Sequence, residues 1–403
     1  MTDVQRAPIE GWATDFDHTH PDYAAHAPEI WDELRTECPV AHSDRNGGMW
    51  LPTKHADVAA VAHDTESFSS EGVIVSPFKP EGLAPRGYAP PITSDPPFHA
   101  EARRLLLAAF SPKSIARWEG ATREACRELI DELLASGDDI ADVAARYTQH
   151  IPVRVIADML GLPREDGDKF RVWIHRIIEL PGAYADTVEY EETLFYYLTM
   201  KVEERRAAPP QDDLIGYLVG VEVDGEPLPT EHIVGTIGLL IIAGIDTTWS
   251  AIGASLWHLG QHPDDRRRLA TDPDVLPFAV EEFLRFYAPV TMARIVAEDH
   301  VEIGGCPVNK RDWVLLPFPS ANRDPEAFEQ ADEFVIDRQR NRHVAFGLGI
   351  HRCLGSNLAR LELTVALEEW MKRVPDFELS DPDAVRWSTG QVRGPRELPM
   401  RLL

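Results

Sequence analysis

Apolar residues recur at intervals of three and four from about residue 98 to residue 290, in stretches such as AEARRLLLAAF and TREACRELIDELLAS. This spacing is typical of amphipathic helices. Strand signals are short and lie mainly at 49–61, 290–318 and 384–402. The pattern predicts a mainly α fold with small peripheral β-sheets. Because there is no internal repeat and no Gly/Ser-rich linker, we expect residues 1–403 to form a single domain.

One long helix is predicted in the middle of the chain. Residues 231–262 contain no proline and are followed by Pro263, and Thr230 is placed as a possible N-cap. Such a helix would be roughly 48 Å long and would cross the whole domain. Its middle is apolar apart from Asp246 and Thr247, and polar groups in a buried helix need partners or a function.

Seven prolines lie between Pro77 and Pro97, so neither a helix nor a central strand is expected there. Loops of this length inside a compact domain usually cover or line a site. We therefore predict a long ordered loop next to the functional site. A surface excursion with no such role is the alternative.

Composition excludes several classes of protein. Lys plus Arg total 40 and Asp plus Glu total 67, a net charge of −27, which argues against binding to nucleic acid or to anionic membranes. The N-terminal residues have no signal-peptide pattern, and the longest apolar stretch, near 237–243, is too short to span a membrane. The four cysteines form no CxxC pair, so a disulfide framework is not expected. We expect a soluble cytoplasmic protein.

The strongest chemical signal is the segment FGLGIHRCLG at 346–355, which is followed by an apolar helical stripe. This places Cys353 at the start of a helix, where backbone N–H groups and the helix dipole lower the pKa of a thiol and suit it to bind a metal. The glycines leave room for the backbone to pass close to something flat or bulky. An ordinary buried cysteine at a glycine-rich turn is the alternative interpretation.

Read as FGxGxHxCxG, this segment resembles the haem-binding loop of the cytochrome P-450 superfamily at every fixed position. The resemblance implies the cytochrome P-450 fold, with the long central helix over haem b and Cys353 as the axial ligand of the haem iron. It implies that His99, Arg103, Arg294 and His351 hold the haem propionates. The full set of haem-binding residues that it implies is His99, Arg103, Ala243, Gly244, Arg294, Phe346, Gly347, His351, Cys353 and Gly355.

Glu282 and Arg285 match the ExxR pair of the same family, and Arg338 stands where the family supplies a second arginine. His343 precedes the haem loop where a supporting histidine is usual. The resemblance implies that these four residues are structural and hold the loop that carries Cys353. On spacing alone, an exposed ion pair is the commoner meaning of ExxR.

The segment AGIDTT at 243–248 resembles the oxygen-binding groove of the family, where a glycine loosens the central helix and an acid and an alcohol follow. The resemblance implies that Asp246 and Thr247 are catalytic and deliver protons to bound oxygen. The alternative is that Thr247 bonds back to a carbonyl one turn earlier and only bends the helix.

By family position, the substrate pocket is expected to be mostly apolar, with Tyr184, Tyr190, Tyr196 and Tyr197 as possible hydrogen-bond donors. An apolar pocket favours a small, largely hydrophobic or aromatic organic substrate. The resemblance implies that this substrate is hydroxylated or O-dealkylated with one atom from O2. The residues assigned to the pocket are Val75, Phe78, Leu240, Ala243, Val290, Met292 and Val392.

The sequence has no dinucleotide fingerprint and no cysteine cluster for an iron–sulfur centre. The resemblance therefore implies that electrons from NAD(P)H arrive through a separate ferredoxin and its reductase, docking near Arg352 and Arg360. Two other functions remain open, a peroxide-driven haem peroxygenase and a non-catalytic haem-binding sensor. The presence of Asp246 and Thr247 argues against both.

Overall fold

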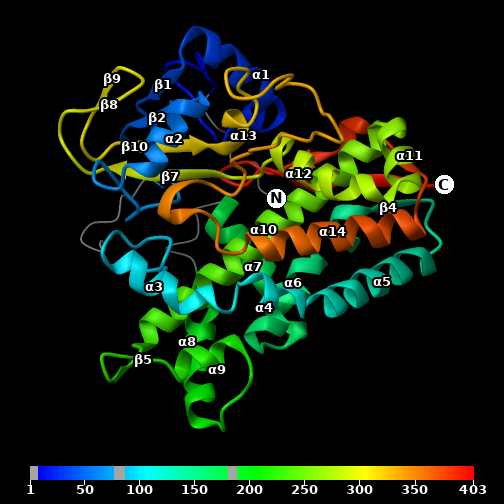
Figure 1. Cartoon of the computed structure of the whole chain (residues 1–403), viewed down its shortest axis with the longest axis horizontal. Coiled ribbons are helices and arrows are strands. Elements are labelled where there is room, and N and C mark those ends of the chain that lie inside the picture. Colours follow the sequence, from blue (N-terminus) through cyan, green and yellow to red (C-terminus); the bar gives the residue numbers. More distant parts are fainter. Residues whose placement is uncertain (1–7, 77–86, 180–187) are drawn as a thin grey trace.

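The computed structural model describes residues 8–76, 87–179 and 188–403, and helices dominate this part of the chain (Figure 1). The helices are α1 (Pro21–Glu37), α2 (His55–His63), α3 (Phe98–Leu107), α4 (Pro112–Ala116), α5 (Glu119–Ala135), α6 (His150–Leu160), α7 (Gly167–Ile174), α8 (Leu194–Ala207), α9 (Leu214–Val219), α10 (Thr230–Gln261), α11 (Pro263–Thr271), α12 (Leu276–Phe286), α13 (Phe318–Ala321) and α14 (Ser356–Arg373). The strands are β1 (Val40–Ser43), β2 (Met49–Pro52), β3 (Phe68–Ser69), β4 (Ile140–Asp142), β5 (Glu222–Val223), β6 (Glu226–Pro227), β7 (Thr291–Val296), β8 (Val301–Ile303), β9 (Cys306–Val308), β10 (Trp313–Pro317), β11 (Phe377–Leu379), β12 (Arg386–Trp387), β13 (Pro395–Glu397) and β14 (Pro399–Leu402). The mainly α fold with small sheets is confirmed.

The predicted strand at 49–61 is only partly correct, because it ends at Pro52 and α2 begins at His55. The apolar residues of this stretch belong to two patterns. Val58, Val61 and Ala62 are buried at helical spacing on one face of α2. A short apolar run does not by itself distinguish a strand from a helix.

The largest sheet has five strands in the order β1-β2-β10-β7-β3, antiparallel except for the parallel pair β2 and β10. The central strand β10 is buried throughout, and its side chains alternate between the two faces. Trp313 and Leu315 pack with buried residues of α1, whereas Val314 and Leu316 pack with those of α2. The two helices therefore cover opposite faces of this sheet.

The long helix α10 runs for 32 residues, roughly 48 Å, through the interior and contacts α6, α8 and α14. Thr230 is its first helical residue rather than its N-cap, because the Thr230 hydroxyl donates to Glu203 at 3.0 Å instead of capping the helix. Among the described residues, only α10 is long and apolar enough to cross a membrane, and most of its apolar window is buried within the protein. That burial is typical of a core helix.

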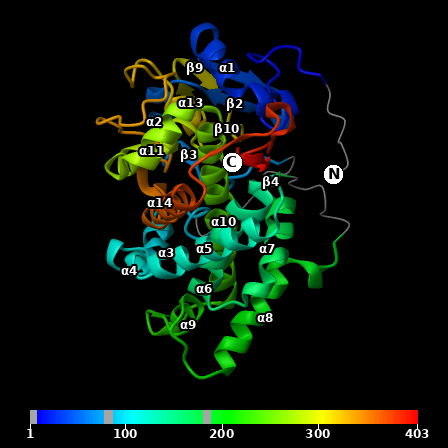
Figure 2. The same ribbon diagram turned by 90° about the vertical axis from the view of Figure 1, so that its right-hand side faces the viewer.

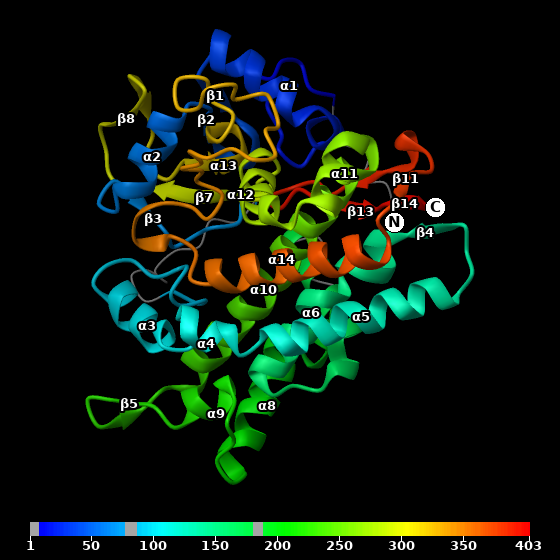
Figure 3. The ribbon, with the colours of Figure 1, turned by 45° about the vertical axis from the view of Figure 1, so that its right-hand side comes forward.

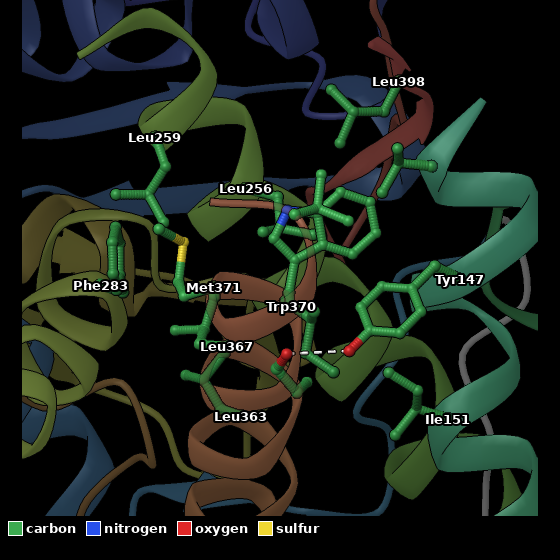
Figure 4. Close-up of a cluster of buried hydrophobic side chains, with 14 of the residues drawn as sticks. Tyr147, Ile151, Leu256, Leu259, Phe283, Leu363, Leu367, Trp370, Met371 and Leu398 are labelled. Carbon is green, nitrogen blue, oxygen red and sulfur yellow. Dashed lines mark hydrogen bonds between the residues drawn. The ribbon is translucent and has the colours of Figure 1, made fainter. Parts of the chain in front are cut away.

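A large core forms where α5, α14 and the second half of α10 meet, and α14 passes close to both other helices (Figure 3). Figure 4 shows Trp370 of α14 packed among leucines, with Tyr147 donating its hydroxyl hydrogen to the carbonyl of Ala366 at 2.8 Å. This packing fixes α14, and the loop at 346–355 leads directly into α14.

The opposite end of the molecule from α1 is formed by α8 and α9 (Figures 1 and 2). The proline-rich segment contains no helix or strand in its described part, residues 87–97, and α3 begins directly after it at Phe98. Residues 77–86 of the predicted loop lie outside the described residues.

Candidate active site

The loop at 346–355 is fixed by its own backbone and by α2. The backbone N–H of Cys353 donates to the carbonyl of Phe346 at 2.7 Å. Gly349 has a φ of +65°, and a Cβ atom there would lie 2.4 Å from the carbonyl oxygen of Ala62. Only glycine allows this approach, so the loop is held close to the end of α2.

Cys353 lies ahead of α14, which begins at Ser356, so the prediction that it opens a helix is wrong by three residues. Burial raises the pKa of its thiol, and the backbone hydrogen bond with Gly355 and the charge of Arg103 offset only part of this effect. The expected lowering of the pKa by a helix terminus is therefore not found. A metal cation at the sulfur would supply the missing stabilisation of the thiolate.

A cavity with an empty volume of about 1480 Å³, its mouth included, lies between this loop and α10. Its walls are mostly apolar. Leu240, Ala243, Gly244 and Thr247 line it from α10, and their spacing places them on one helix face. The other residues singled out in the sequence that line it are Arg103, Val290, Met292, Arg294, Phe346, Gly347, His351, Cys353 and Gly355.

Sequence reasoning did not name several further cavity residues. Pro91 and Ile92 come from the proline-rich segment, in agreement with the prediction that this segment lines a site. Phe110, Ile156 and Phe318 add apolar wall from other elements. These three come from distant parts of the sequence, so no local pattern marks them.

Two residues assigned to the substrate pocket do not line this cavity, and both assignments are corrected. Val75 is buried with side chains of α1 and the five-stranded sheet. Val392 is buried and forms an isolated β-bridge with Val290, so its partner rather than Val392 itself reaches the cavity. Phe78 lies outside the described residues.

The described tyrosines of the predicted cluster do not line the cavity either. Tyr197 donates to the Asp166 carboxylate at 2.7 Å, and Tyr190 and Tyr196 pack edge to face against each other. Tyr184 lies outside the described residues. These three described tyrosines are therefore structural in this conformation.

Four basic side chains gather at one edge of the cavity. The His99 and His351 rings are 4.4 Å apart, and burial lowers the pKa of His99 to about 4 and that of His351 to about 2, so both are neutral near pH 7. Burial lowers the pKa of Arg294 to about 10. Arg294 donates to the Ala293 carbonyl, and within the described ranges it has no carboxylate in ion-pair contact.

Two polar groups of this edge are poorly satisfied by the protein itself. The Nε2 atom of His99 is buried without a hydrogen-bond partner in the described structure. Arg103 donates to the carbonyl of Arg352 at 2.6 Å but also pairs with no carboxylate in the part of the chain that is described. Buried donors and cations without anions indicate a place for an anionic group.

Glu282 and Arg285, the predicted ExxR pair, are fully buried. Arg285 donates two hydrogen bonds to the Glu282 carboxylate, both at 2.8 Å, and both side chains are 0 % exposed. Arg338 donates to the same carboxylate at 3.0 Å, and the backbone N–H of Val335 donates to it at 2.8 Å. The cluster joins α12 to the chain that precedes the loop at 346–355.

Next to it, Glu281 forms a second junction that sequence reasoning missed. Its carboxylate accepts from Arg360 of α14 at 2.5 and 2.8 Å and from His343 at 3.0 Å. Burial raises the pKa of Glu281, but these two partners outweigh it and lower the value to about 2. Arg360, expected at a docking face, is therefore already paired.

Asp246 is buried on α10 and belongs to a chain of charges that reaches the surface. Its carboxylate lies 2.7 Å from the Arg396 guanidinium, an ion contact without hydrogen-bond alignment. Arg396 donates to Glu179 at 2.6 Å, and Glu179 bonds His175 at 3.0 Å, whose side chain is 39 % exposed. Burial raises the pKa of Asp246 to about 6, although Arg396 opposes the change.

Thr247 faces the cavity, and its hydroxyl donates to the carbonyl of Ala243 at 2.7 Å. This is the hydrogen bond to a carbonyl one turn earlier that the sequence analysis gives as the alternative role of Thr247. It leaves the hydroxyl oxygen free to accept a hydrogen bond from the cavity side. The expected opening of the helix is not found, because α10 is continuous through Gly244.

Comparisons with known proteins show the family of this chain. The family model for cytochrome P-450 matches residues 175–386. The mycinamicin IV hydroxylase/epoxidase of Micromonospora griseorubida is 33 % identical over 356 residues, which cover 87 % of this chain and 89 % of that protein. The chain belongs to the cytochrome P-450 family.

Solved structures show the same fold for this cytochrome P-450. The bacillaene polyketide synthase cytochrome P-450 PksS of Bacillus subtilis 168 superposes with a TM-score of 0.84 and 29 % identity, covering 96 % of this chain and 99 % of the other. CYP109E1 of Bacillus megaterium, solved in complex with testosterone, superposes with a TM-score of 0.83 and 32 % identity, covering 95 % of this chain and 99 % of the other. The protein is a cytochrome P-450 monooxygenase, and its family uses haem and O2.

The residues of the cavity fit haem. A thiol on the loop, glycines that let the backbone approach a flat group, and an edge of unpaired basic groups are the features that an iron porphyrin with two carboxylates requires. Cys353 would hold the iron, and Arg103, Arg294, His351 and the unpartnered Nε2 of His99 would bind the propionates. The cavity is thus explained by the family's cofactor.

Proposed function

We propose that this cytochrome P-450, acting as one haem domain over residues 1–403, inserts one oxygen atom from O2 into a largely hydrophobic organic substrate. The observation that carries this proposal is that Cys353 and Thr247 line one apolar cavity from the haem-type loop and from α10. When bound there, haem supplies an iron that binds and activates O2.

Thr247 and Asp246 would move protons to the oxygen site. The Thr247 hydroxyl holds its own hydrogen against Ala243, so its oxygen accepts from a water that it orients in the cavity. Asp246, with a pKa of about 6, changes protonation near neutral pH. Arg396 pairs with Asp246 and Glu179, and Glu179 bonds the partly exposed His175, so this chain of charges holds Asp246 at a connection to the exterior, from which water would return its proton.

The substrate is proposed to be a small, largely hydrophobic or aromatic molecule that is hydroxylated or O-dealkylated. Leu240, Ile156, Phe110 and Val290 give the cavity apolar walls, and Thr247 and Thr248 are among its few polar groups. One relative is named a mycinamicin IV hydroxylase/epoxidase, and another was solved in complex with testosterone. Both names are consistent with a hydrophobic substrate.

Electrons are proposed to come from NAD(P)H through a ferredoxin and its reductase in the cytoplasm. Arg352 is exposed next to Cys353 and remains available to an acidic carrier. Because Arg360 is paired with Glu281, charge reversal at Arg360 would disturb the loop support as well as docking. Arg352→Glu is therefore the cleaner test of the docking face, and it should slow reduction at low salt while leaving the haem spectrum unchanged.

The proposal is tested by incubating the haem-loaded protein with NADH, a surrogate ferredoxin and reductase, and a panel of apolar aromatic compounds selected for a blue-shifted Soret band. Mass spectrometry with isotopically labelled O2 should show one labelled oxygen in the product. A parallel reaction with hydrogen peroxide alone identifies a peroxygenase if it gives the same product at a higher rate. Binding of the compounds without product from either system would support a sensor and contradict the proposal.

Thr247→Ala separates proton delivery from binding. The variant should keep the haem and substrate spectra, because Cys353 and the apolar walls are untouched. Product per NADH should fall about tenfold, with hydrogen peroxide released instead. Thr199→Ala on α8 is the matched control, since its hydroxyl makes the same back-bond at 2.8 Å on an exposed face. An unchanged product ratio would show that Thr247 only shapes the helix.

A further inference from the structure

A second cavity is lined by residues of α1, of the ends of α10 and α12, of α13 and of the C-terminal segment. It has an empty volume of about 900 Å³, its mouth included, and no described residue lines both this cavity and the active-site cavity. We name it the arginine–aromatic pocket after the six residues that define its chemistry, Arg323, Arg393, Trp257, Trp387, Phe286 and Tyr287.

Arg393 is held in place without an anionic partner. Its Nε donates to the carbonyl of Ala24 at 2.9 Å, and its guanidinium lies 4.2 Å from the centre of the Trp387 ring. Within the described ranges, no carboxylate forms an ion pair with it and neither terminal nitrogen makes a hydrogen bond to the protein. Arg393 is partly buried, and its terminal nitrogens are free to donate to an anion in the pocket.

Arg323 supplies a second guanidinium to the same pocket. Its Nε contacts Asp332 at 3.2 Å, and the group lies 4.0 Å from the centre of the Phe286 ring. Its terminal nitrogens make no hydrogen bond to the described protein. The pocket thus presents the terminal donors of two arginines. Among the described residues, Glu29 is the one carboxylate that lines it, and Glu29 is exposed at the surface.

The walls between these arginines are aromatic. The Trp257 ring packs edge to face against both Trp387, at 5.2 Å, and Tyr287, at 5.7 Å. Tyr287 is fixed in turn because its hydroxyl bonds His258 at 2.7 Å. Rigid aromatic walls accept a flat ring with little loss of conformational freedom.

We propose that the arginine–aromatic pocket binds a planar aromatic carboxylate, whose ring lies against the tryptophan and phenylalanine walls and whose carboxylate accepts from Arg323 and Arg393. Guanidinium groups match carboxylates because they offer parallel donors in a plane. The pocket is a second ligand site of the protein, independent of the catalytic cavity.

The test uses 2-naphthoate as the probe and the haem-loaded protein, with binding measured by titration calorimetry. One 2-naphthoate should bind without shifting the Soret band, since none of the described residues that line this pocket also lines the active-site cavity. Arg393→Met and Arg323→Met should each weaken binding about tenfold or more, and neutral 2-naphthamide should bind about tenfold more weakly than the acid to the unaltered protein. Arg267→Met on the exposed face of α11 is the matched control.

Two further measurements keep the outcome clear. Unchanged haem content and an unchanged circular dichroism spectrum show that each arginine variant is folded. If Arg393→Met does not fold, the binding measurement on Arg323→Met is enough to test the proposal. Leu240→Trp narrows the catalytic cavity and should leave 2-naphthoate binding unchanged. Three results would each overturn the proposal: loss of 2-naphthoate binding in Leu240→Trp, an affinity in both arginine variants that equals that of the unaltered protein, or no binding of 2-naphthoate to the unaltered protein.

Discussion

Glu281 joins three segments that must stay together for the loop of Cys353 to keep its place. It lies on α12, accepts two hydrogen bonds from Arg360 of α14, and accepts one from His343 just before the loop. The Nδ1 atom of His343 accepts from the backbone of Ala345, so its Nε2 carries the hydrogen donated to Glu281. We predict that Glu281→Gln weakens this junction and loosens the haem.

The magnitude follows from the pKa. A fall from 4.5 to about 2 on folding corresponds to roughly 3.4 kcal/mol of stabilisation. Because the Glu281 and Arg360 side chains are 30 % and 31 % exposed, water screens part of this interaction, and we expect about 2 kcal/mol. Since the pKa is lower in the folded state, the stabilisation is complete above pH 4.5 and is lost as the pH falls from 4.5 towards 2.

The assay is urea unfolding followed by tryptophan fluorescence and haem absorbance. At pH 7 the free energy of unfolding of Glu281→Gln should be about 2 kcal/mol below that of the unaltered protein, and at pH 3.5 the difference should shrink by roughly 1 kcal/mol. Glu302→Gln, at an exposed position of β8, is the matched control and should change little. A difference that is the same at both pH values, or no larger than that of Glu302→Gln, would refute this role of Glu281.

Two further predictions concern the loop and the central helix. Gly349→Ala should lower haem loading and should reduce the free energy of unfolding by more than about 1 kcal/mol beyond the effect of Gly305→Ala. Both glycines have positive φ, but of the two only at Gly349 would the Cβ atom meet a backbone oxygen, at 2.4 Å. An equal loss of stability in the two variants, measured by thermal unfolding, would refute the close approach. Folding raises the pKa of Asp246 from 3.8 to about 6. The folded state therefore holds this proton more tightly than the unfolded state, and the unaltered protein loses stability as the pH rises from 3.8 to 6. The stability of Asp246→Asn relative to the unaltered protein should therefore rise by up to roughly 3 kcal/mol across that range, and a flat difference would contradict the buried, ionising carboxyl.

Features carried by contiguous residues were predictable from the sequence. The absence of proline over 231–262 predicted the long helix, and the spacing of glycine, histidine and cysteine in 346–355 predicted the loop and its family. In both cases the physical constraint acts between neighbours along the chain. The mainly α fold followed for the same reason, because helical periodicity is local.

Features made by distant segments were not predictable. Arg396 comes from the C-terminal segment, Asp246 from α10, and Glu179 from the turn of π-helix at His175–Glu179 that follows α7. No spacing in the sequence relates these three residues. The sequence indicates a surface charge at Arg360 that is free to bind a partner protein, because its ion-pair partner Glu281 lies 79 positions away along the chain. Val392 is apolar and buried as expected, but which wall it forms depends on how the segments pack.

The central claim is that Cys353 holds haem in a cavity whose opposite wall carries Thr247. The most direct measurement is the absorbance spectrum of the reduced protein with carbon monoxide, compared between the unaltered chain, Cys353→Ser and Cys306→Ser. We predict the strongly red-shifted Soret band of a thiolate-ligated haem in the unaltered chain and in Cys306→Ser, and its loss in Cys353→Ser. A red-shifted band that persists in Cys353→Ser, or that is lost in Cys306→Ser, would contradict the account.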